Sequence, residues 1–326
     1  MSGARALAGR AVLVTGASGF IGSHVSRALV EAGAEVHALV RRGSSLWRMR
    51  DLPCPVTVWE GDVTDYESVL RCCRGTMPVA IVHLAGDTSG RRFEGDWTVV
   101  DLSVAVNLQG TLNLVRGAVE SGAPVSILLR AGGLEEYGTG ETPYDEAQRE
   151  QPSSPYSAAQ VAATHFCQML QHSAAFGIVT LRPALVYGPA QSAAFFIPSL
   201  ILSCLRKTRF EMTSGEQQRD LIFVEDLVDA FLRALTRDDL RGDVINIASG
   251  EEHSIRDVAQ TIVELTGAPG VLRIGAAAER AVDLKHLVAR AERAEATLGW
   301  RPTVRLIEGL RRTIAWYRAH PTQEVP

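Results

Sequence analysis

The chain has 326 residues, enough for one large domain or two modest ones with a sizeable core. Its 33 basic and 37 acidic residues give a formal net charge of −4, so it lacks the basic excess typical of nucleic-acid-binding proteins, and we expect no nucleic-acid partner. Apolar residues make up 46% and charged residues 21%, which is ordinary globular usage and excludes bulk disorder.

No run of apolar residues is long enough to cross a bilayer, and the N-terminal MSGARALAGR has no apolar core or cleavage signal. We therefore expect a cytoplasmic protein with no membrane partner. The five cysteines are odd in number and lack Cys-x-x-Cys spacing, and the eight histidines are scattered, so neither disulfides nor a metal site are expected. The final PTQEVP is expected to be frayed.

Short apolar runs alternate with helical patterns, which is typical of βαβ units and a parallel sheet. Buried strands are predicted at 11–15, 35–40, 56–59, 79–84, 125–129 and 178–181, with a returning strand at 244–248. Helices are predicted at 20–32, 108–119, 156 onward, 226–236, 255–266 and 306–318. Residues 189–220 have a less regular pattern.

Two of these helices carry specific expectations. Leu108, Leu112, Val115 and Val119 recur at helical spacing and predict the buried face of the helix over 108–119. Ser254, followed three residues later by Asp257, predicts a capping box at the N-terminus of the helix over 255–266.

The first predicted strand leads directly into the loop TGASGFIG, whose glycines have Gly-x-x-Gly-x-x-Gly spacing. Small residues let backbone amides approach a pyrophosphate, and the N-terminus of the following helix favours negative charge. A tight structural turn is the alternative, but the strand–turn–helix context favours a dinucleotide site. The loop residues expected at the cofactor are Gly16, Ser18, Gly19, Phe20, Ile21 and Gly22.

The second predicted strand is followed by Arg41, Arg42 and Ser44, where an NAD site commonly has the carboxylate that bonds the ribose 2′-hydroxyl. A guanidinium suits a 2′-phosphate instead, so NADP(H) is favoured. NAD(H) stays open, because two exposed arginines can simply solvate a loop.

Two further segments are expected to contact the adenosine half of the cofactor. Asp62 and Val63, after the third strand, are expected at the adenine. The backbone after the fourth strand, at Leu84, Ala85 and Gly86, is expected beside the ribose and phosphates.

Several motifs occur in a fixed order: TGASGFIG, Asp62, HLAG, Asn107 in NLQGTLNL, Tyr156, LRPALVYGP, QQRDLIFVEDLVDA and LGWRP. In this order the chain resembles the extended short-chain dehydrogenases/reductases, which are nucleotide-sugar epimerases, dehydratases and reductases. The resemblance covers residues 10–318. The stretch EVHALVRRGSS is also similar to the NADP-binding segment of GDP-mannose 4,6-dehydratases.

The resemblance implies an α/β fold, a Rossmann doubly wound parallel sheet with a smaller C-terminal α/β substrate-binding domain. Residues 1–182 would form the NAD(P)-binding domain, with a returning segment near 218–248. Residues 183–326 would mainly bind the nucleotide sugar.

The resemblance also implies roles at the reaction centre. Tyr156 would be the catalytic acid/base, Asn107 would hold backbone and water near the site, and Pro183 would lie beside the nicotinamide.

On the substrate side, Arg219 would contact the diphosphate of the nucleotide sugar. Tyr187, Phe195, Phe196 and Ile197 would line the sugar and base pocket. Plain core packing explains the aromatic pair Phe195 and Phe196 equally well.

The chain departs from the family at two catalytic positions. The motif Tyr-x-x-x-Lys reads here as Tyr156 to Gln160, on one helix face. The family's Ser or Thr, four residues before a Tyr-Gly pair, is replaced by Gly133. Gln160 can bond a ribose hydroxyl but carries no charge.

A free tyrosine has a pKa of about 10, so roughly one in a thousand is ionised at pH 7. Without a neighbouring cation Tyr156 stays protonated, which handicaps proton abstraction from an alcohol more than proton donation to a ketone. An oxidised nicotinamide is itself cationic, and Arg130 at the end of the fifth strand is another source of charge.

Glu135 lies two residues before the Tyr137-Gly138 pair, a position that commonly holds glutamate in sugar 4,6-dehydratases and uronate decarboxylases. In the dehydratases this glutamate abstracts a proton from sugar carbon 5. The preceding Leu134 is apolar where some dehydratases have an acid, and a solvated loop glutamate is the alternative.

We therefore expect an NAD(P)-dependent enzyme acting on a nucleotide-activated hexose by 4-keto reduction, 4,6-dehydration or epimerisation. The missing lysine favours reduction, and Glu135 favours the other two. The alternative is a catalytically degenerate protein that binds cofactor and nucleotide sugar as a sensor or partner subunit.

A homodimer is implied by relatives that pair through the helix carrying the Tyr-x-x-x-Lys motif. Here the side chains compatible with that contact are Ala158, Val161, Ala162 and Leu170.

Overall fold

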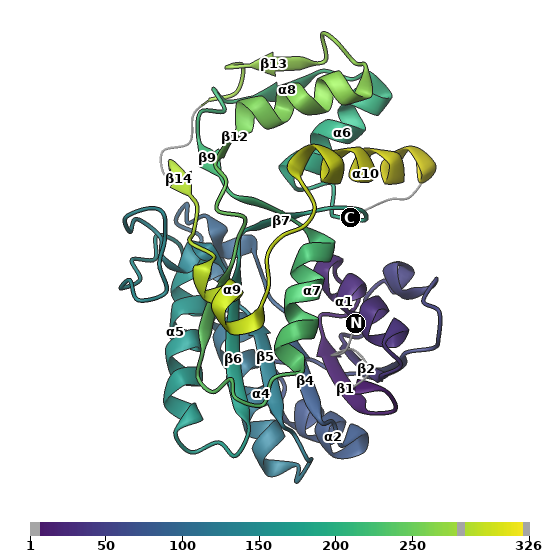
Figure 1. Ribbon diagram of the computed structural model, residues 1–326, viewed down its shortest axis with the longest axis vertical. Helices are drawn as coiled ribbons and strands as arrows, with labels where there is room; N and C mark the ends of the chain where they lie inside the picture. The colour runs from purple at the N-terminus through teal and green to yellow at the C-terminus, as the bar shows by residue number, and fades with distance from the viewer. Residues whose placement is uncertain (1–6, 279–283, 322–326) are drawn as a thin grey trace.

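The computed structural model describes residues 7–278 and 284–321, so most of the expected frayed end lies outside the described residues. Its described residues form a seven-stranded parallel sheet in the order β11-β6-β5-β4-β1-β2-β3 (Figure 1). The strands are β1 Ala11–Thr15, β2 Glu35–Val40, β3 Thr57–Glu60, β4 Ala80–His83, β5 Ile127–Ala131, β6 Gly177–Pro183 and β11 Val244–Ile247.

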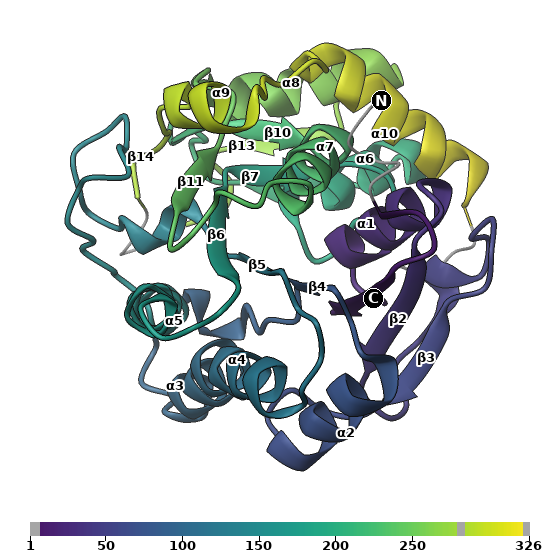
Figure 2. The same ribbon diagram turned by 60° about the horizontal axis from the view of Figure 1, so that its bottom comes forward.

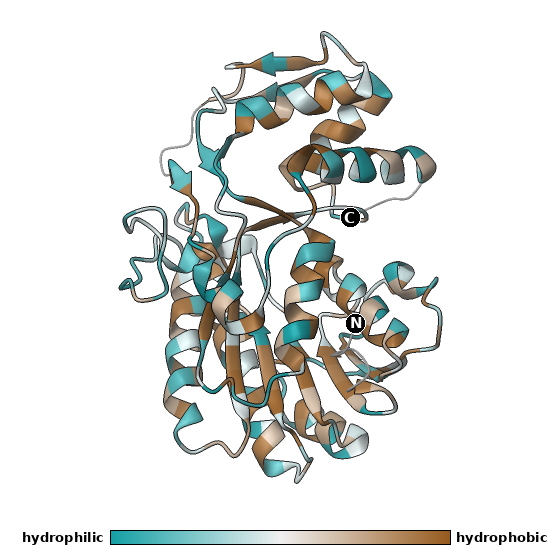
Figure 3. Ribbon diagram, in the orientation of Figure 1, coloured by the Kyte–Doolittle hydropathy of each residue, from teal (hydrophilic) through white to brown (hydrophobic). Residues whose placement is uncertain are grey.

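The predicted doubly wound sheet is confirmed, with strand ends shifted by one or two residues. The third strand begins at Thr57 rather than at residue 56, and the fifth spans Ile127–Ala131 rather than 125–129. β4 and β6 are buried along their whole length, as expected for strands of a parallel sheet covered on both faces. The apolar character of these strands is visible in Figure 3.

Helices cover both faces of the sheet (Figure 2). One face carries α1 Phe20–Glu31 and α7 Val224–Leu235, which pack on each other. The other carries α2 Tyr66–Thr76, α4 Gly110–Glu120 and α5 Pro155–Gln171. The strand order reverses between β1 and β4, and in sheets of this kind ligands bind at that point.

The predicted buried face of the helix over 108–119 is wrong in part. α4 begins only at Gly110, because residues Val104–Gln109 form a π-helical stretch after α3 Thr98–Ser103. A π-helix has wider turns than an α-helix, so the spacing from Leu108 does not carry into α4, whose buried face includes Leu114 and Ala118 rather than Val119. Val119 is 58% exposed, whereas Leu114 is fully buried.

The strands outside the large sheet form three small sheets among the described residues. The pairs are β7 Leu185–Tyr187 with β10 Leu221–Phe223, β8 Phe210–Met212 with β13 Leu272–Ile274, and β9 Gln218–Arg219 with both β12 His253–Ser254 and β14 His286–Leu287. Around them lie α6 Phe196–Arg206, α8 Ile255–Thr266, α9 Glu292–Leu298 and α10 Leu306–Ala319.

α6 was not expected from the sequence, which has an irregular pattern over residues 189–220. Leu200, Ile201 and Cys204 on α6 are buried in a core shared with α8 and α10. Pro198 lies in its first turn, where proline costs no intrahelical hydrogen bond. The capping box predicted for α8 is confirmed in its first half, since the Ser254 hydroxyl accepts a hydrogen bond from the Asp257 N–H. The return bond from the Asp257 side chain is not found among the described residues.

Short 3₁₀ turns connect some of these elements, at Trp47–Met49, Ser89–Arg91 and Leu134–Glu136. None of the helices that the structure describes has the length and apolarity needed to cross a membrane.

Candidate active site

A cavity of about 470 Å³ lies at the carboxyl ends of β1, β4, β5 and β6, and we call it the central cavity. It brings together most of the residues predicted from the sequence. Those lining it are Gly16, Gly19, Phe20, Ile21, Gly22, Leu84, Ala85, Gly86, Gly133, Glu135, Tyr156, Gln160, Pro183, Tyr187, Phe195, Phe196 and Ile197.

The loop between β1 and α1 is closed by backbone contacts that only glycine permits. Gly16 has φ +70°, and a Cβ there would lie 2.5 Å from the Leu84 backbone. A Cβ at Gly22 would lie 2.0 Å from the Gly16 carbonyl oxygen. Gly19 caps α1 without a side-chain hydrogen bond, and the first N–H groups of a helix have no intrahelical acceptor. The cavity wall therefore presents a helix N-terminus suited to an anion.

A buried histidine fixes the backbone after β4. The Thr15 hydroxyl accepts a hydrogen bond from the Ala85 N–H at 3.2 Å and donates to His83 Nδ1 at 2.7 Å. His83 Nε2 lies 3.1 Å from the Thr111 hydroxyl, which itself donates to the Asn107 carbonyl. Because the Thr111 hydroxyl donates elsewhere, Nε2 of His83 carries a proton, and a neutral ring leaves Nδ1 to accept from Thr15. Burial, with a smaller contribution from Arg130, lowers the pKa of His83 to about 3.

Tyr156 lies in the first turn of α5, where Pro155 begins the helix and the Ser154 hydroxyl caps it. Its side chain is 6% exposed and lines the central cavity. Burial raises the pKa of Tyr156, and the nearby Glu135 raises it further. Arg91 and a hydrogen bond from Gln160 act in the opposite direction, so the net result is a phenol that keeps its proton.

Gln160 has a partner that the sequence did not assign to it. Its Oε1 accepts a hydrogen bond from the Arg130 guanidinium, which also donates to the hydroxyls of Thr164 at 2.7 Å and Thr180 at 3.3 Å. Since Oε1 faces Arg130, the amide nitrogen of Gln160 is the group left to donate to Tyr156. Arg130 therefore reaches the tyrosine only through Gln160.

A closed set of buried charges lies behind the cavity. Arg182 donates to Glu136 at 2.7 Å and to Glu150 at 2.6 Å, and Glu136 also accepts from Thr164. Arg182 and Glu136 are both fully buried, so their mutual charges and hydrogen bonds replace the lost hydration. Glu136 Oε1 also accepts from the Gly133 N–H at 3.1 Å, which fixes the loop after β5.

Glu135 occupies the space in front of Gly133. A Cβ at Gly133 would lie 2.7 Å from Glu135 Oε2 and 3.6 Å from the Tyr156 hydroxyl oxygen. The Glu135 side chain is 17% exposed, so the alternative of a solvated loop glutamate is wrong. Its carboxylate thus stands beside the position where the family has a Ser or Thr side chain.

Sequence reasoning missed Arg91, in the 3₁₀ turn after β4. Its guanidinium lies 2.9 Å from Glu135 Oε1 and 5.2 Å from the centre of the Tyr156 ring. Burial lowers the pKa of Arg91, but Glu135 and Tyr156 outweigh this and raise it overall. The sequence signal for Arg91 was its position after a predicted parallel strand, because the loops at the carboxyl ends of such strands line the ligand crevice.

Arg48 is a second arginine that the sequence did not indicate. It lines the central cavity and donates to the Ala190 carbonyl at 2.9 Å and the Ser18 carbonyl at 3.4 Å. Its guanidinium also lies 4.4 Å from the Trp47 ring. These contacts connect the segment after β2 with the loop between β1 and α1.

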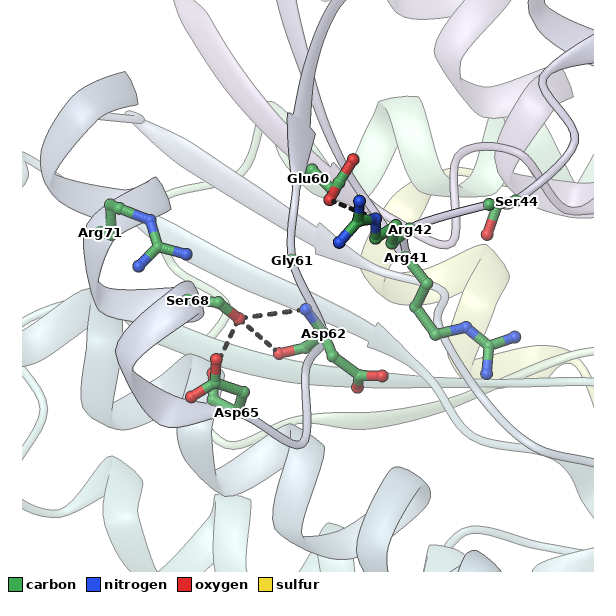
Figure 4. A pocket seen from close by; sticks show the side chains of 10 residues that line it. Arg41, Arg42, Ser44, Glu60, Gly61, Asp62, Asp65, Ser68 and Arg71 are labelled. Carbon is green, nitrogen blue, oxygen red and sulfur yellow. Dashed lines mark hydrogen bonds and ion pairs between the residues drawn. The ribbon is translucent and has the colours of Figure 1, made fainter.

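A second cavity of about 610 Å³, the arginine cavity, lies at the ends of β2 and β3 (Figure 4). The predicted residues Arg41, Arg42, Ser44 and Asp62 line it, and Arg71 on α2 extends into it from the other side. Glu60 pairs with Arg42 at 3.6 Å, but no ion pair joins Arg41 to a residue that the structure describes. Asp62 Oδ1 accepts from the Thr64 N–H and hydroxyl.

Four predicted residues line neither cavity. The Val63 side chain is buried, and Ser18 contributes its carbonyl to Arg48. Asn107 binds both the N–H and the carbonyl of Asp87, so it holds backbone rather than facing the cavity. Arg219 is buried beside β14 and donates to the Gln218 carbonyl at 2.8 Å.

The predicted aromatic residues differ in how much of the cavity wall they form. Tyr187 is 1% exposed, packs on Phe223 and donates to the Leu306 carbonyl, so it is chiefly a core residue. Phe195 is 37% exposed and lies 5.9 Å from Arg91, so it is not simply core. Phe196 packs edge-on against Phe210.

The NAD dependent epimerase/dehydratase family matches residues 12–248, and the chain belongs to this family. The family's fold and the loops that line the central cavity together define the class: a nicotinamide-dependent enzyme of the Rossmann type.

Particular relatives carry out different reactions. The chain is 31% identical to the UDP-glucose 4-epimerase of Mycolicibacterium smegmatis, covering 94% of this chain and 98% of that one. It is 30% identical to the mouse (Mus musculus) dTDP-D-glucose 4,6-dehydratase, covering 94% and 88%. It is 27% identical to the GDP-6-deoxy-D-mannose reductase of Pseudomonas aeruginosa, covering 96% and 99%.

Among solved structures, MoeE5 in complex with UDP-glucuronic acid and NAD superposes with a TM-score of 0.81. It is 31% identical, and the match covers 95% of this chain and 99% of that one. The relatives are therefore epimerases, dehydratases and reductases of nucleotide sugars, and the chain is an enzyme of this class.

Proposed function

We propose that this protein reduces the keto group of a nucleotide-linked hexose, with NADPH as the preferred reductant and Tyr156 as the proton donor. The observation that carries the proposal is the partner of Tyr156: a neutral Gln160, itself bonded to Arg130, stands where the family has lysine. A tyrosine that keeps its proton is suited to donate it rather than to remove one from an alcohol.

The central cavity fits the cofactor that this reaction needs. The glycines of the β1–α1 loop close a wall with no side chain in front of the α1 N-terminus, which suits the pyrophosphate. The Pro183 end of the cavity, beside Tyr156, is where the nicotinamide would lie. A bound reduced nicotinamide supplies the hydride that converts a ketone to an alcohol.

The chain's own part of the reaction is a proton transfer. As the carbonyl oxygen gains negative charge, the Tyr156 O–H would donate its proton to it, and the O–H bond of the tyrosine breaks. The resulting phenolate accepts a hydrogen bond from the Gln160 amide and later regains a proton from water. Phe195, Phe196 and Ile197 supply the apolar wall on the sugar side.

The arginine cavity supports NADP(H) over NAD(H). Arg41, Arg42, Ser44 and Arg71 line one cavity, and a 2′-phosphate beside Arg41 would receive charge-assisted hydrogen bonds from its guanidinium. Arg42 is already paired with Glu60, so Arg41 is the residue expected to contribute most.

A second candidate, 4,6-dehydration or epimerisation, is favoured by one observation. Glu135 places a carboxylate next to Tyr156, where a base for carbon–hydrogen bond cleavage is needed. Its ion pair with Arg91 weighs against it, because a carboxylate held by an arginine is a weaker base.

A homodimer through α5 is supported by exposed apolar side chains. Phe166 and Met169 on α5 are 42% and 51% exposed, and Trp97, next to α3, is 69% exposed. Apolar groups gathered on packed helices are typical of a subunit interface. Sedimentation should show a dimer, and Phe166→Asp should yield monomer; a monomeric native protein would refute this part.

The proposed function is tested by mixing the protein with NADPH and a panel of 4-keto nucleotide sugars and following loss of the reduced nicotinamide. We expect turnover with at least one UDP-, dTDP-, GDP- or CDP-linked substrate. Formation of a 4-keto sugar from a nucleotide hexose, without net NADPH loss, would support the second candidate. Cofactor binding with no turnover in either direction would support a catalytically degenerate protein.

A further inference from the structure

Two charged side chains, Arg91 and Glu135, stand beside Tyr156 in a site where Gln160 and Gly133 take the places of the family's lysine and Ser or Thr. The family's lysine and Ser or Thr are absent here, yet a cation and an oxygen-bearing group stand beside the phenol. Arg91 and Glu135 come from different loops, after β4 and β5, and meet at the central cavity.

Three groups surround the Arg91 guanidinium: the Tyr156 ring, the Phe195 ring and the Glu135 carboxylate. Its guanidinium carbon lies 5.2 Å from the Tyr156 ring and 5.9 Å from the Phe195 ring. Its Nη2 lies 2.9 Å from Glu135 Oε1. Its Nε is buried and has no hydrogen-bond partner among the residues that the structure describes. A guanidinium fixed in this way has a donor left for a charge that develops during reaction.

Glu135 explains why the serine position can be glycine. The Cβ of any residue larger than glycine at position 133 would meet Glu135 Oε2 at 2.7 Å. The carboxylate and a family-type side chain therefore compete for the same volume. In this chain that volume is filled by the Glu135 carboxylate, which anchors Arg91.

We propose that Arg91 stabilises the Tyr156 phenolate in place of the lysine that the family uses, and that Glu135 both anchors Arg91 and moderates its charge. This inference deepens the proposed function, on which its catalytic meaning rests. Arg130 does not take this role directly, because its two terminal nitrogens donate to Gln160, Thr164 and Thr180. Its Nε has no partner among the described residues, but Arg130, unlike Arg91, does not line the central cavity.

The two charges act on Tyr156 in opposite directions. Glu135 raises the pKa of Tyr156 and Arg91 lowers it, in addition to the larger raising effect of burial. Removing Arg91 alone would also leave Glu135 unpaired, which would raise the pKa through a second cause. The contribution of Arg91 is therefore isolated only when residue 135 is neutral in both proteins compared.

The test measures ionisation of Tyr156 directly, with no cofactor or substrate. The protein is labelled with 3-fluorotyrosine at its six tyrosines, and the ¹⁹F signal absent from Tyr156→Phe is assigned to Tyr156. The compared pair is Glu135→Gln and Arg91→Met/Glu135→Gln. Arg91→Lys/Glu135→Gln restores a cation, and Arg92→Met, at the exposed neighbouring arginine, is the matched control.

We expect Tyr156 in Arg91→Met/Glu135→Gln to ionise at least about one pH unit higher than in Glu135→Gln. Arg91→Lys/Glu135→Gln should recover most of that shift. In Arg92→Met, Tyr156 should ionise at the same pH as in wild type. Equal ionisation in the compared pair would overturn the proposal, as would an equal effect of Arg92→Met. A shift without turnover on any keto sugar would instead refute the proposed function and leave the role of Arg91 standing.

Discussion

Gln160 accepts a hydrogen bond from the buried Arg130 guanidinium, so the residue that replaces the family's lysine is itself held by a cation. The Gln160 amide lies between the Arg130 charge and Tyr156, whereas the Arg91 guanidinium, from another loop, stands directly beside the Tyr156 ring. This relationship has a consequence for attempts to restore the family motif.

Gln160→Lys should destabilise the protein rather than improve it. A lysine ammonium at this position would meet the fully buried Arg130, and two buried like charges are unfavourable by roughly 3 kcal/mol or more. Thermal unfolding should show a clear loss of Tm. The control Gln160→Met removes only the hydrogen bonds and should lose about 1–3 kcal/mol. A lysine variant as stable as wild type and faster in turnover would contradict this reading of the site.

Adding a methyl group at Gly133 should alter activity more than stability. The Cβ would meet the free end of Glu135 at 2.7 Å, and that carboxylate can move away, so Gly133→Ala should lose less than about 1 kcal/mol. Displacing Glu135 from Arg91 should nevertheless slow turnover. The matched control is Gly132→Ala, whose Cβ would lie 2.1 Å from the locked, fully buried Glu136.

For Gly132→Ala we expect the larger loss of stability, about 1–3 kcal/mol, measured by denaturant unfolding. If Gly133→Ala were the less stable of the two variants, Glu135 would have to be as firmly held as Glu136.

Arg41→Ala should discriminate between the two coenzymes. Loss of a charge-assisted hydrogen bond to a 2′-phosphate should weaken NADPH binding by about 10- to 100-fold, while NADH binding stays within about twofold. Fluorescence titration measures both. Arg42→Ala is the control and should have the smaller effect, since Arg42 is 90% exposed and paired with Glu60. Equal weakening of NADH and NADPH would refute the assignment of a 2′-phosphate site.

The buried His83 should make the protein sensitive to acid. Its pKa is about 3 in the folded chain against 6.5 when unperturbed, so the unfolded state binds the extra proton as the pH falls below 6.5. The stability contributed by neutral His83 is thus complete above pH 6.5 and is lost progressively between pH 6.5 and 3. His83→Gln should flatten the fall of Tm with pH over this range. His172→Gln, at an exposed histidine, should not.

The loop between β1 and α1 was predictable because the constraints on its backbone are local. Gly16 and Gly22 are required by backbone contacts between residues only a few positions apart or at the end of the next strand. The parallel sheet was predictable for a similar reason, since each buried strand is a short apolar run. The division into domains at residue 182 stays a prediction.

The charge around Tyr156 was not predictable, because it depends on how separate loops pack. Arg91 lies eight residues beyond β4 in an irregular segment, and nothing in its local sequence indicates that it meets Glu135. Arg130 was considered as a source of charge, but only the structure shows that it reaches Gln160. Arg219 bonds backbone beside β14 and lines neither cavity, so its diphosphate role stays a prediction.

We propose that Tyr156 donates the proton to the substrate inside a cavity that would also hold the nicotinamide. The most direct measurement compares kcat and the Kd for NADPH in wild type and Tyr156→Phe. The variant removes one hydroxyl from a buried ring, so we expect kcat to fall at least about 100-fold while the Kd changes by less than about threefold. A phenylalanine variant that turns over a keto sugar at nearly the wild-type rate would contradict the role of Tyr156 as proton donor.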